Sequence, residues 1–476
     1  MQRYNLFIIF FIVAVSAQAQ WTNAVLDSLT NNNFRDEVKR QSITVDGSNI
    51  IHVAYMRARP AGGWVIYYRQ KPNNQQWNNE ILISDSSFAA FTPAIAVDHN
   101  SGTPYVVYTQ DQGSGLEIFL ASNSGGGWNS IPVTANNSDD EVPTIAVDGN
   151  GNVHLAWIGP DSLGIFRIFY STNISGNWNT QILTNSNLGQ FGSGAYPFIA
   201  STNGGTAHII YRGGGFGNYK IDHAYNAGPG SNLWLHENII TPNSEDYTGV
   251  MTVGPDSTIN VAITGSGGFG FPNDVYYLYK PQGQQWSFPE LINSGFNGEA
   301  FSIFLDTSGF VHISINEISG NIYTGNVYYA SDLQGGGGWL VGPLLTTNDI
   351  YNASIILDNQ NDGYALAFQG TTFETQEIVV YGKSDTVTGI NNLFLFDDIM
   401  VYPNPITDLL KINGKTNNLN IIDIKLHNVN GEEVKINYDN SAQSHLLMDF
   451  NYLPAGIYFL QLVVEGYIQN YKLIKK

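Results

Sequence analysis

The sequence predicts an all-β protein built from a repeated unit, and two observations lead to this prediction. Short runs rich in Val, Ile, Tyr and Phe alternate with polar residues, and Gly, Asn and Asp separate them, as is typical of strands joined by tight turns. A similar unit recurs at intervals of 50 to 54 residues from Trp21 to about Lys383. No window has the sustained period of an amphipathic helix, so we expect sheets throughout this region.

The clearest copy of the unit runs from Pro143 to Leu183 and contains four short strand patterns. Its first strand is followed by Asp148, and the equivalent positions in the other units are Asp46, Asp98, Thr202, Gly254, Asp306 and Asp358. Seven units of four strands predict a seven-bladed β-propeller over residues 20–384, in which each blade is one four-stranded sheet.

The tryptophans predict how this ring closes. A Trp opens the fourth strand of six units, at Trp77, Trp128, Trp178, Trp234, Trp286 and Trp339, and the seventh unit has none. The segment Trp21–Leu26 matches Trp77–Leu82 position for position. We therefore expect the N-terminal strand to complete the last blade and to cover an edge that would otherwise be exposed.

Charge and cysteine content exclude several classes of function. The chain has 476 residues, with 40 acidic and 20 basic ones and a formal net charge of −20. Such a charge argues against nucleic acid or an anionic membrane as the main partner, because both attract basic surfaces. The chain has no Cys, which excludes disulfides, thiolate metal sites and thiol catalysis.

Residues 1–19 have the pattern of a secretory signal peptide. Arg3 is their only charge, ten apolar residues run from Leu6 to Val15, and small residues precede Gln20. A helix of this length spans about 15 Å, which is short of a hydrocarbon layer of about 30 Å. We expect the mature chain to begin at Gln20 and to have no transmembrane segment.

The segment from residue 400 to 476 differs from the repeats and follows a linker at 385–399. It begins with Tyr402-Pro403-Asn404-Pro405, continues with a turn at Gly431, and ends with strands that contain Gly456 and Tyr458. These blocks resemble the type A C-terminal sorting domain of the type IX secretion system of Bacteroidetes-type bacteria. The resemblance implies a small β-sandwich that the secretion machinery recognises, and a protein that is secreted or attached to the outer cell surface.

Two sets of propeller loops could hold a ligand. Acidic residues shortly before the inner strands could form a ring near the axis: Glu37, Glu141, Asp246, Glu299 and Asp349. Such a ring could bind a polar substrate or a cation such as calcium, although solvated or capping carboxylates explain it as well. Arg57, Arg59 and Arg212 lie on loops of the same face, where a glycan or a carboxylate would find charged and aromatic partners. We predict no resident cofactor and assign no metal ligands.

Two further patterns are interpreted as structural. His52, His154, His208 and His312 begin the second strands of four units, and they lie on different blades, so they cannot converge on one metal. Ser171–Trp178 resembles a degraded Asp-box of sialidase-like propellers, a turn that lies away from the sialidase active site. The likeness to sialidase-like and lectin-like propellers therefore concerns the fold alone, and the early Arg motif of sialidases is absent.

The sequence thus favours a secreted propeller that binds glycans or proteins through its loop face, without catalysis. The alternative is a sialidase-like glycoside hydrolase or lyase that uses rim carboxylates such as Glu141 and Glu299. A purely structural adhesion component is a third reading.

Overall fold

The structure is a computed structural model. It describes residues 21–27, 36–37, 40–59, 62–72, 75–183, 195–214, 217–266, 273–319, 322–332, 339–344, 350–357, 363–369, 378–384, 399–402, 406–414, 421–428, 433–439, 445–464 and 467–476. The regular elements of these residues are all β-strands. The predicted signal peptide lies outside the described residues. Within them, no helix is long and apolar enough to cross a membrane.

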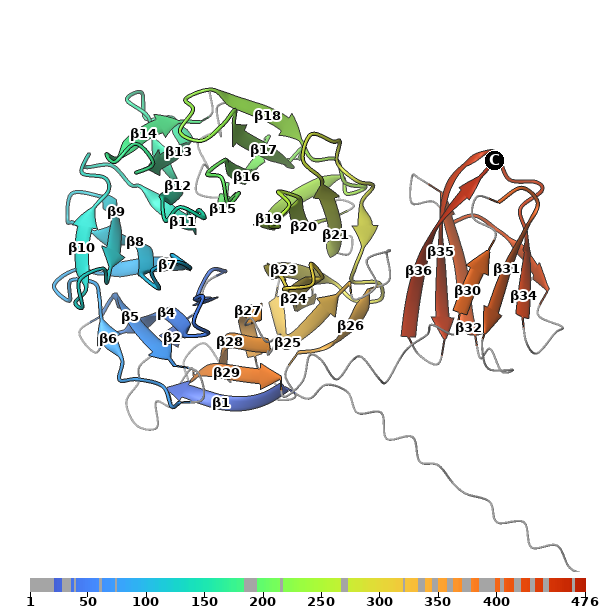
Figure 1. Ribbon diagram of the computed structural model, residues 1–476, viewed down its shortest axis with the longest axis horizontal. Coiled ribbons are helices and arrows are strands. Elements are labelled where there is room, and N and C mark those ends of the chain that lie inside the picture. Colours follow the sequence, from blue (N-terminus) through green and yellow to red (C-terminus); the bar gives the residue numbers. More distant parts are fainter. Residues whose placement is uncertain are drawn as a thin grey trace, which may run out of the picture.

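Seven separate antiparallel sheets are described between Trp21 and Ser384, six of four strands and one of five (Figure 1). The first three are β2 (Asp36–Glu37), β3 (Ile43–Val45), β4 (Ile51–Ala58), β5 (Trp64–Lys71) and β6 (Ile81–Leu82); β7 (Ala90–Val97), β8 (Pro104–Asp111), β9 (Leu116–Ser122) and β10 (Asn129–Pro132); and β11 (Glu141–Val147), β12 (Val153–Pro160), β13 (Phe166–Thr172) and β14 (Asn179–Ile182). The next two are β15 (Phe198–Ser201), β16 (Ala207–Gly213), β17 (Lys220–Asn226) and β18 (Trp234–Asn238); and β19 (Glu245–Val253), β20 (Ile259–Ser266), β21 (Asn273–Lys280) and β22 (Glu290–Leu291). The last two are β23 (Gly298–Leu305), β24 (Val311–Ser319), β25 (Ile322–Ser331) and β26 (Leu340–Pro343); and β27 (Ile350–Leu357), β28 (Gly363–Gln369), β29 (Ile378–Ser384) and β1 (Trp21–Asp27).

The sheets follow one another around a common centre, with the first strand of each nearest to it (Figure 1). Contacts between these inner strands run from β3 to β7, β11, β15, β19, β23 and β27, and β27 in turn contacts β3. At the periphery, β1 pairs antiparallel with β29, from Trp21 opposite Ser384 to Val25 opposite Val380. The chain's first described strand therefore lies in the same sheet as β27 to β29.

The hydrophobic core lies between neighbouring sheets, because both faces of the second strands are covered. In β12 the run from Val153 to Gly159 is buried throughout, and Trp157 is 1% exposed. Trp157 packs in one cluster with Val107 and Ile118 of the preceding sheet. Burying a side chain of this size contributes roughly 2 to 3 kcal/mol, which explains why these strands are apolar on both faces.

The inner strands are irregular near their N-terminal ends. In the first sheet the inner strand consists of two pieces, β2 and β3, which both pair with β4 and are separated by a stretch that includes Arg40 and Gln41. The ladders of β7, β11, β19, β23 and β27 each show a register shift at the corresponding place. The backbone therefore leaves the ladder where the inner strands approach the centre.

The C-terminal region contains two further sheets. One has β30 (Ile399–Tyr402), β31 (Leu409–Gly414), β34 (His445–Asp449) and β33 (Asn437–Asp439), and the other has β32 (Ile421–Asn428), β35 (Gly456–Val464) and β36 (Tyr467–Lys475). Side chains of both sheets, such as Leu410 and Leu460, enter one shared hydrophobic cluster. This cluster is separate from the cores of the seven preceding sheets.

Candidate functional site

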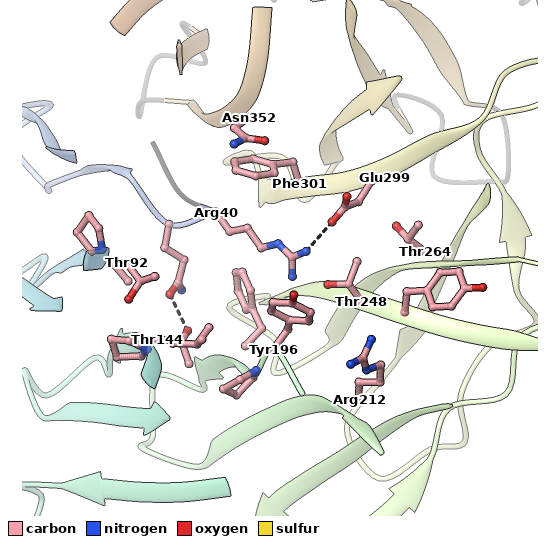
Figure 2. Close-up of a pocket in the computed structure, with 18 of the residues that line it drawn as sticks. Arg40, Thr92, Thr144, Tyr196, Arg212, Thr248, Thr264, Glu299, Phe301 and Asn352 are labelled. Atoms are coloured by element: carbon pink, nitrogen blue, oxygen red, sulfur yellow. Dashed lines mark hydrogen bonds and ion pairs between the residues drawn. The ribbon is translucent and has the colours of Figure 1, made fainter. Parts of the chain in front are cut away.

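A pocket of about 450 Å³ lies at the centre, where the inner strands begin (Figure 2). All seven sheets contribute to its wall, with Arg40, Thr92, Val142, Tyr196, Thr248, Phe301 and Asn352 as one residue from each. Its volume lies within the range of roughly 300 to 1,000 Å³ that is common for small-molecule sites. The convergence of seven sheets on one cavity makes it the best candidate for a binding site among the described residues.

The backbone of the pocket wall is strained. Among the described residues other than glycine, seven have a positive φ, and four of these line the pocket: Thr92, Val142, Tyr196 and Asn352, at 49°, 53°, 42° and 55°. A β-branched residue such as Val142 rarely adopts this conformation, which costs on the order of 1 to 3 kcal/mol per residue. Strain of this kind is often found at binding sites, where it directs a side chain that regular strand geometry would turn elsewhere.

Tyr196 is placed between two arginines. Its side chain is 42% exposed, and the guanidinium carbons of Arg40 and Arg212 each lie 5.6 Å from the centre of its ring. The backbone N–H of Arg212, in β16, donates to the carbonyl oxygen of Ala195 at 2.7 Å. This bond holds the segment that precedes β15, which includes Tyr196, against β16. Arg212 also lies over the ring of Tyr219, at 4.3 Å. The pocket therefore presents a partly exposed aromatic ring with two guanidinium groups within cation–π distance of it.

Two pairs of polar side chains lie within the pocket wall, Arg40 with Glu299 and Gln41 with Thr144. Arg40 Nη2 lies 2.7 Å from Glu299 Oε1, and Figure 2 shows the two side chains pointing toward one another. Gln41 joins the first sheet to the third, because its Oε1 accepts from Thr144 Oγ1 at 2.6 Å and its Nε2 donates to the Ile145 carbonyl oxygen at 3.1 Å. Glu299 is the one carboxylate among the described lining residues.

Of the arginines predicted from the sequence, Arg212 lines the pocket. Arg57 Nη1 is bound by both carboxylate oxygens of Glu80, at 2.8 and 2.9 Å, within its own sheet. Arg59 donates from Nη1 to the backbone carbonyl oxygen of Ser86. Neither Arg57 nor Arg59 is among the lining residues of the described pocket.

The predicted acidic ring does not come together in the described residues. Glu299 lines the pocket, whereas Asp246 is fully buried and accepts from Thr241 Oγ1 and Asn243 Nδ2. Burial raises the pKa of Asp246, and it raises that of Glu141, where Asp139 adds to the effect. Glu141 is half-buried at the start of β11 and is not among the lining residues. Glu37 is described only as part of β2, and Asp349 lies outside the described residues.

Sequence reasoning missed Arg40 and Tyr196. Both occupy the slot of the repeat that also holds Thr92, Val142 and Asn352, six positions before the turn that follows each inner strand. Aligning the units on that slot would have found an aromatic and a basic residue facing one centre. No spacing rule links them directly, because they are 156 positions apart in the chain.

The repeated histidines lie near the starts of the second strands, beside the C-terminal ends of the inner strands. His154 Nδ1 lies 2.7 Å from Tyr170 Oη, and His154 Nε2 lies 3.5 Å from Asp148 Oδ2. The same arrangement joins Asp46, His52 and Tyr68, and joins Asp306, His312 and Tyr329. These buried groups connect a turn to its own sheet. Among the described residues, no three His, Asp or Glu side chains are grouped so that they could hold a metal ion.

The predicted sorting motif is described in part. Tyr402 ends β30, while Pro403, Asn404, Pro405 and Gly431 lie outside the described residues. Gly456 begins β35, and Tyr458 is 6% exposed and donates from Oη to the Pro454 carbonyl oxygen at 2.9 Å. The last blocks of the motif therefore belong to the core of the C-terminal sheets.

Three solved structures are similar to this chain at low identity. They are the polysaccharide lyase Uly1 (10% identity, TM-score 0.47, covering 79% of this chain and 94% of that one), the Hadza microbial sialidase Hz136 (11%, 0.44, 75% and 66%) and the BP39L lectin from Burkholderia pseudomallei (10%, 0.48, 74% and 96%). With TM-scores below 0.5, these similarities do not identify the function of this chain. No curated protein sequence matches it.

The family comparison concerns the C-terminal segment alone. Residues 400–476 match the family described as "Secretion system C-terminal sorting domain". The matched range coincides with the segment that carries the Tyr-Pro-Asn-Pro block and the terminal strands. Residues 400–476 are thus a sorting domain of the type IX secretion system, through which the protein interacts with the secretion machinery and is exported to the cell surface or secreted.

Proposed function

We propose that residues 20–384 form a seven-bladed β-propeller closed by the N-terminal strand, and that this propeller binds glycans in its central pocket. In this proposal residues 1–19 are the signal peptide and residues 385–399 link the propeller to a β-sandwich sorting domain at 400–476. The circuit of inner-strand contacts from β3 to β27 and back to β3 supports a ring of seven blades. The pairing of β1 with β29 supports closure, because it joins the first described strand to the last sheet of the repeat.

One observation carries the binding proposal: Tyr196 is held with a positive φ of 42° and is 42% exposed inside a pocket that all seven sheets line. Holding a partly exposed aromatic ring in a strained backbone conformation at an open site needs a compensating role. The C–H face of a sugar ring stacks on an aromatic ring, and hydroxyl groups bond to neighbouring polar side chains. Thr92, Thr248 and Asn352 provide such side chains around Tyr196.

Binding is favoured over hydrolysis by the distribution of carboxylates. Hydrolysis of a glycosidic bond in most families needs two carboxyl groups on either side of the bond. The described lining offers one carboxylate, Glu299, which is paired with Arg40, and Glu141 is not among the lining residues. The pKa of Glu141 is raised, as that of a general acid would be, so we also test for catalysis.

The test is a glycan array probed with the chain from Gln20 to Lys476, together with a Tyr196→Ala variant. We expect binding to at least one class of glycan, and a loss of at least about tenfold in affinity when the stacking ring is removed. Tyr279→Ala is the matched control, since Tyr279 is 39% exposed but does not line the pocket. Binding that survives in Tyr196→Ala and fails in Tyr279→Ala would place the site elsewhere. Turnover of fluorogenic glycosides that disappears in Glu141→Gln would replace binding by catalysis.

Closure is tested by deleting Trp21–Leu26. Removing β1 leaves β29 as an exposed edge and opens the seventh sheet. We expect the thermal transition to broaden and to move down by several degrees. An unchanged transition would contradict closure and would leave the pocket proposal intact.

A further inference from the structure

Arg212 differs from the other described arginines of the seven sheets. Arg40, Arg57 and Arg167 each lie within 3.1 Å of a carboxylate, and Arg59 and Arg69 donate to backbone carbonyl oxygens. Among the described residues, the guanidinium of Arg212 has neither an acidic partner nor a protein oxygen that accepts from it. Its described neighbours are the rings of Tyr219 and Tyr196.

This lack of an acidic partner is unusual in so acidic a protein. The chain has twice as many acidic as basic residues, 40 against 20, yet the described lining of the pocket contains two arginines and one glutamate. A guanidinium carries five N–H donors in a planar fork that matches a carboxylate. Held on a strand between two aromatic rings, Arg212 is oriented before any ligand arrives.

We infer that the pocket binds a sugar through its carboxylate group, with Arg212 as the main contact for the anion and Tyr196 as the surface on which the sugar ring stacks. The inference rests on the glycan binding proposed above and specifies its ligand class, a uronic acid or another carboxylated sugar. A neutral sugar would stack on Tyr196 and leave the donors of Arg212 without an anion. The 5.6 Å between the Arg212 guanidinium and the Tyr196 ring suits a carboxyl group attached to the stacked ring.

Glu299 has a definite role in this arrangement. It neutralises Arg40 at 2.7 Å and places a negative charge in the wall of the pocket. Replacing it by Gln removes that charge and leaves the positive charge of Arg40 available to the ligand. A ligand with a carboxylate gains affinity from this change, whereas a neutral ligand does not.

Isothermal titration calorimetry on the chain from Gln20 to Lys476 tests the inference, with oligogalacturonate, oligoalginate and chondroitin fragments as probes. Each probe is compared with its carboxyl-reduced counterpart, which keeps the sugar ring and loses the charge. We expect at least one carboxylated probe to bind at least about tenfold more tightly than its reduced form. Arg212→Gln should abolish that preference, and Glu299→Gln should strengthen binding of the carboxylated probe about threefold or more.

Arg167→Gln is the matched control, because Arg167 is paired with Asp161 at 3.1 Å and does not line the pocket. It should leave both affinities unchanged, and the melting temperature of Arg212→Gln should show that this variant folds. Equal affinity for carboxylated and reduced probes, or loss of binding in Glu299→Gln, would overturn the carboxylate inference while glycan binding stands. No binding to any glycan, neutral or acidic, would overturn the proposed function itself.

Discussion

The two ends of the inner strands are built in opposite ways. At the C-terminal ends the turns repeat one arrangement, with an Asp that accepts backbone N–H groups and a buried His that contacts a Tyr in three of the sheets. At the N-terminal ends the residue that faces the pocket varies from sheet to sheet, and four of these residues have a positive φ. The repeat is regular where it stabilises each sheet and irregular where seven sheets meet.

The carboxyl groups show the same contrast. Hydrogen bonds to the turns lower the pKa of Asp46, Asp98, Asp148 and Asp306 in spite of the opposing effect of burial. At the other end burial dominates and raises the pKa of Asp140, Glu141, Asp222, Asp246 and Asp274. Ionised carboxylates therefore stabilise one end of the sheets and destabilise the other.

The largest expected effect is on the free energy of unfolding, and it is measured at two valines of the third sheet. Val153 is fully buried in β12 and is not among the described residues of positive φ, so Val153→Gly should lower the free energy of unfolding by about 4 kcal/mol through lost packing and added chain entropy. Val142 has a φ of 53°, and Gly adopts this conformation without strain, so Val142→Gly should cost less than about 1 kcal/mol. Urea denaturation of the two variants measures both values. Equal losses would show that the pocket wall stores no strain.

The strands, their turns and the repeat could be predicted from the sequence, because alternation, glycine placement and spacing are local signals. The partner of the N-terminal strand was also predictable, since Trp21 copies the pattern of Trp77. The pocket was not. Whether an arginine is free depends on a carboxylate that folding brings to it, as Glu80 is brought to Arg57 from 23 positions away, and the sequence shows only that both residues exist.

The next effect concerns only the turns that follow the C-terminal ends of the inner strands. Asp148 is 4% exposed, and its Oδ1 accepts from the backbone N–H groups of Asn150 and Asn152 at 2.9 and 2.8 Å. Asp148→Ala leaves these donors unpaired and should cost about 3 kcal/mol without changing ligand affinity. Asp256→Ala is the matched control in the fifth sheet, because Asp256 is exposed and should cost less than about 1 kcal/mol. If Asp148→Ala weakened binding as much as folding, the two ends would not be independent.

The smallest effect is a pair of pH dependences with opposite signs. Hydrogen bonds, including one from His154, lower the pKa of Asp148 from 3.8 to about 2, so its stabilising contribution is complete above pH 3.8 and disappears as the pH falls toward 2. The shift corresponds to about 2 kcal/mol, and the stability difference between wild type and Asp148→Asn should shrink by up to this amount over that range.

Burial raises the pKa of Asp246 instead, so its ionisation costs stability as the pH rises above 3.8. Asp246→Asn keeps an acceptor for Thr241 and Asn243, which both donate to Oδ1, and it removes the charge. The free energy of unfolding of Asp246→Asn should therefore increase relative to that of the wild type as the pH rises above 3.8. Over the same range the difference between Asp148→Asn and the wild type should stay constant. Chemical denaturation at a series of pH values measures both trends. Parallel curves for the two variants would mean that the two ends of the sheets share one electrostatic environment, which their hydrogen bonding contradicts.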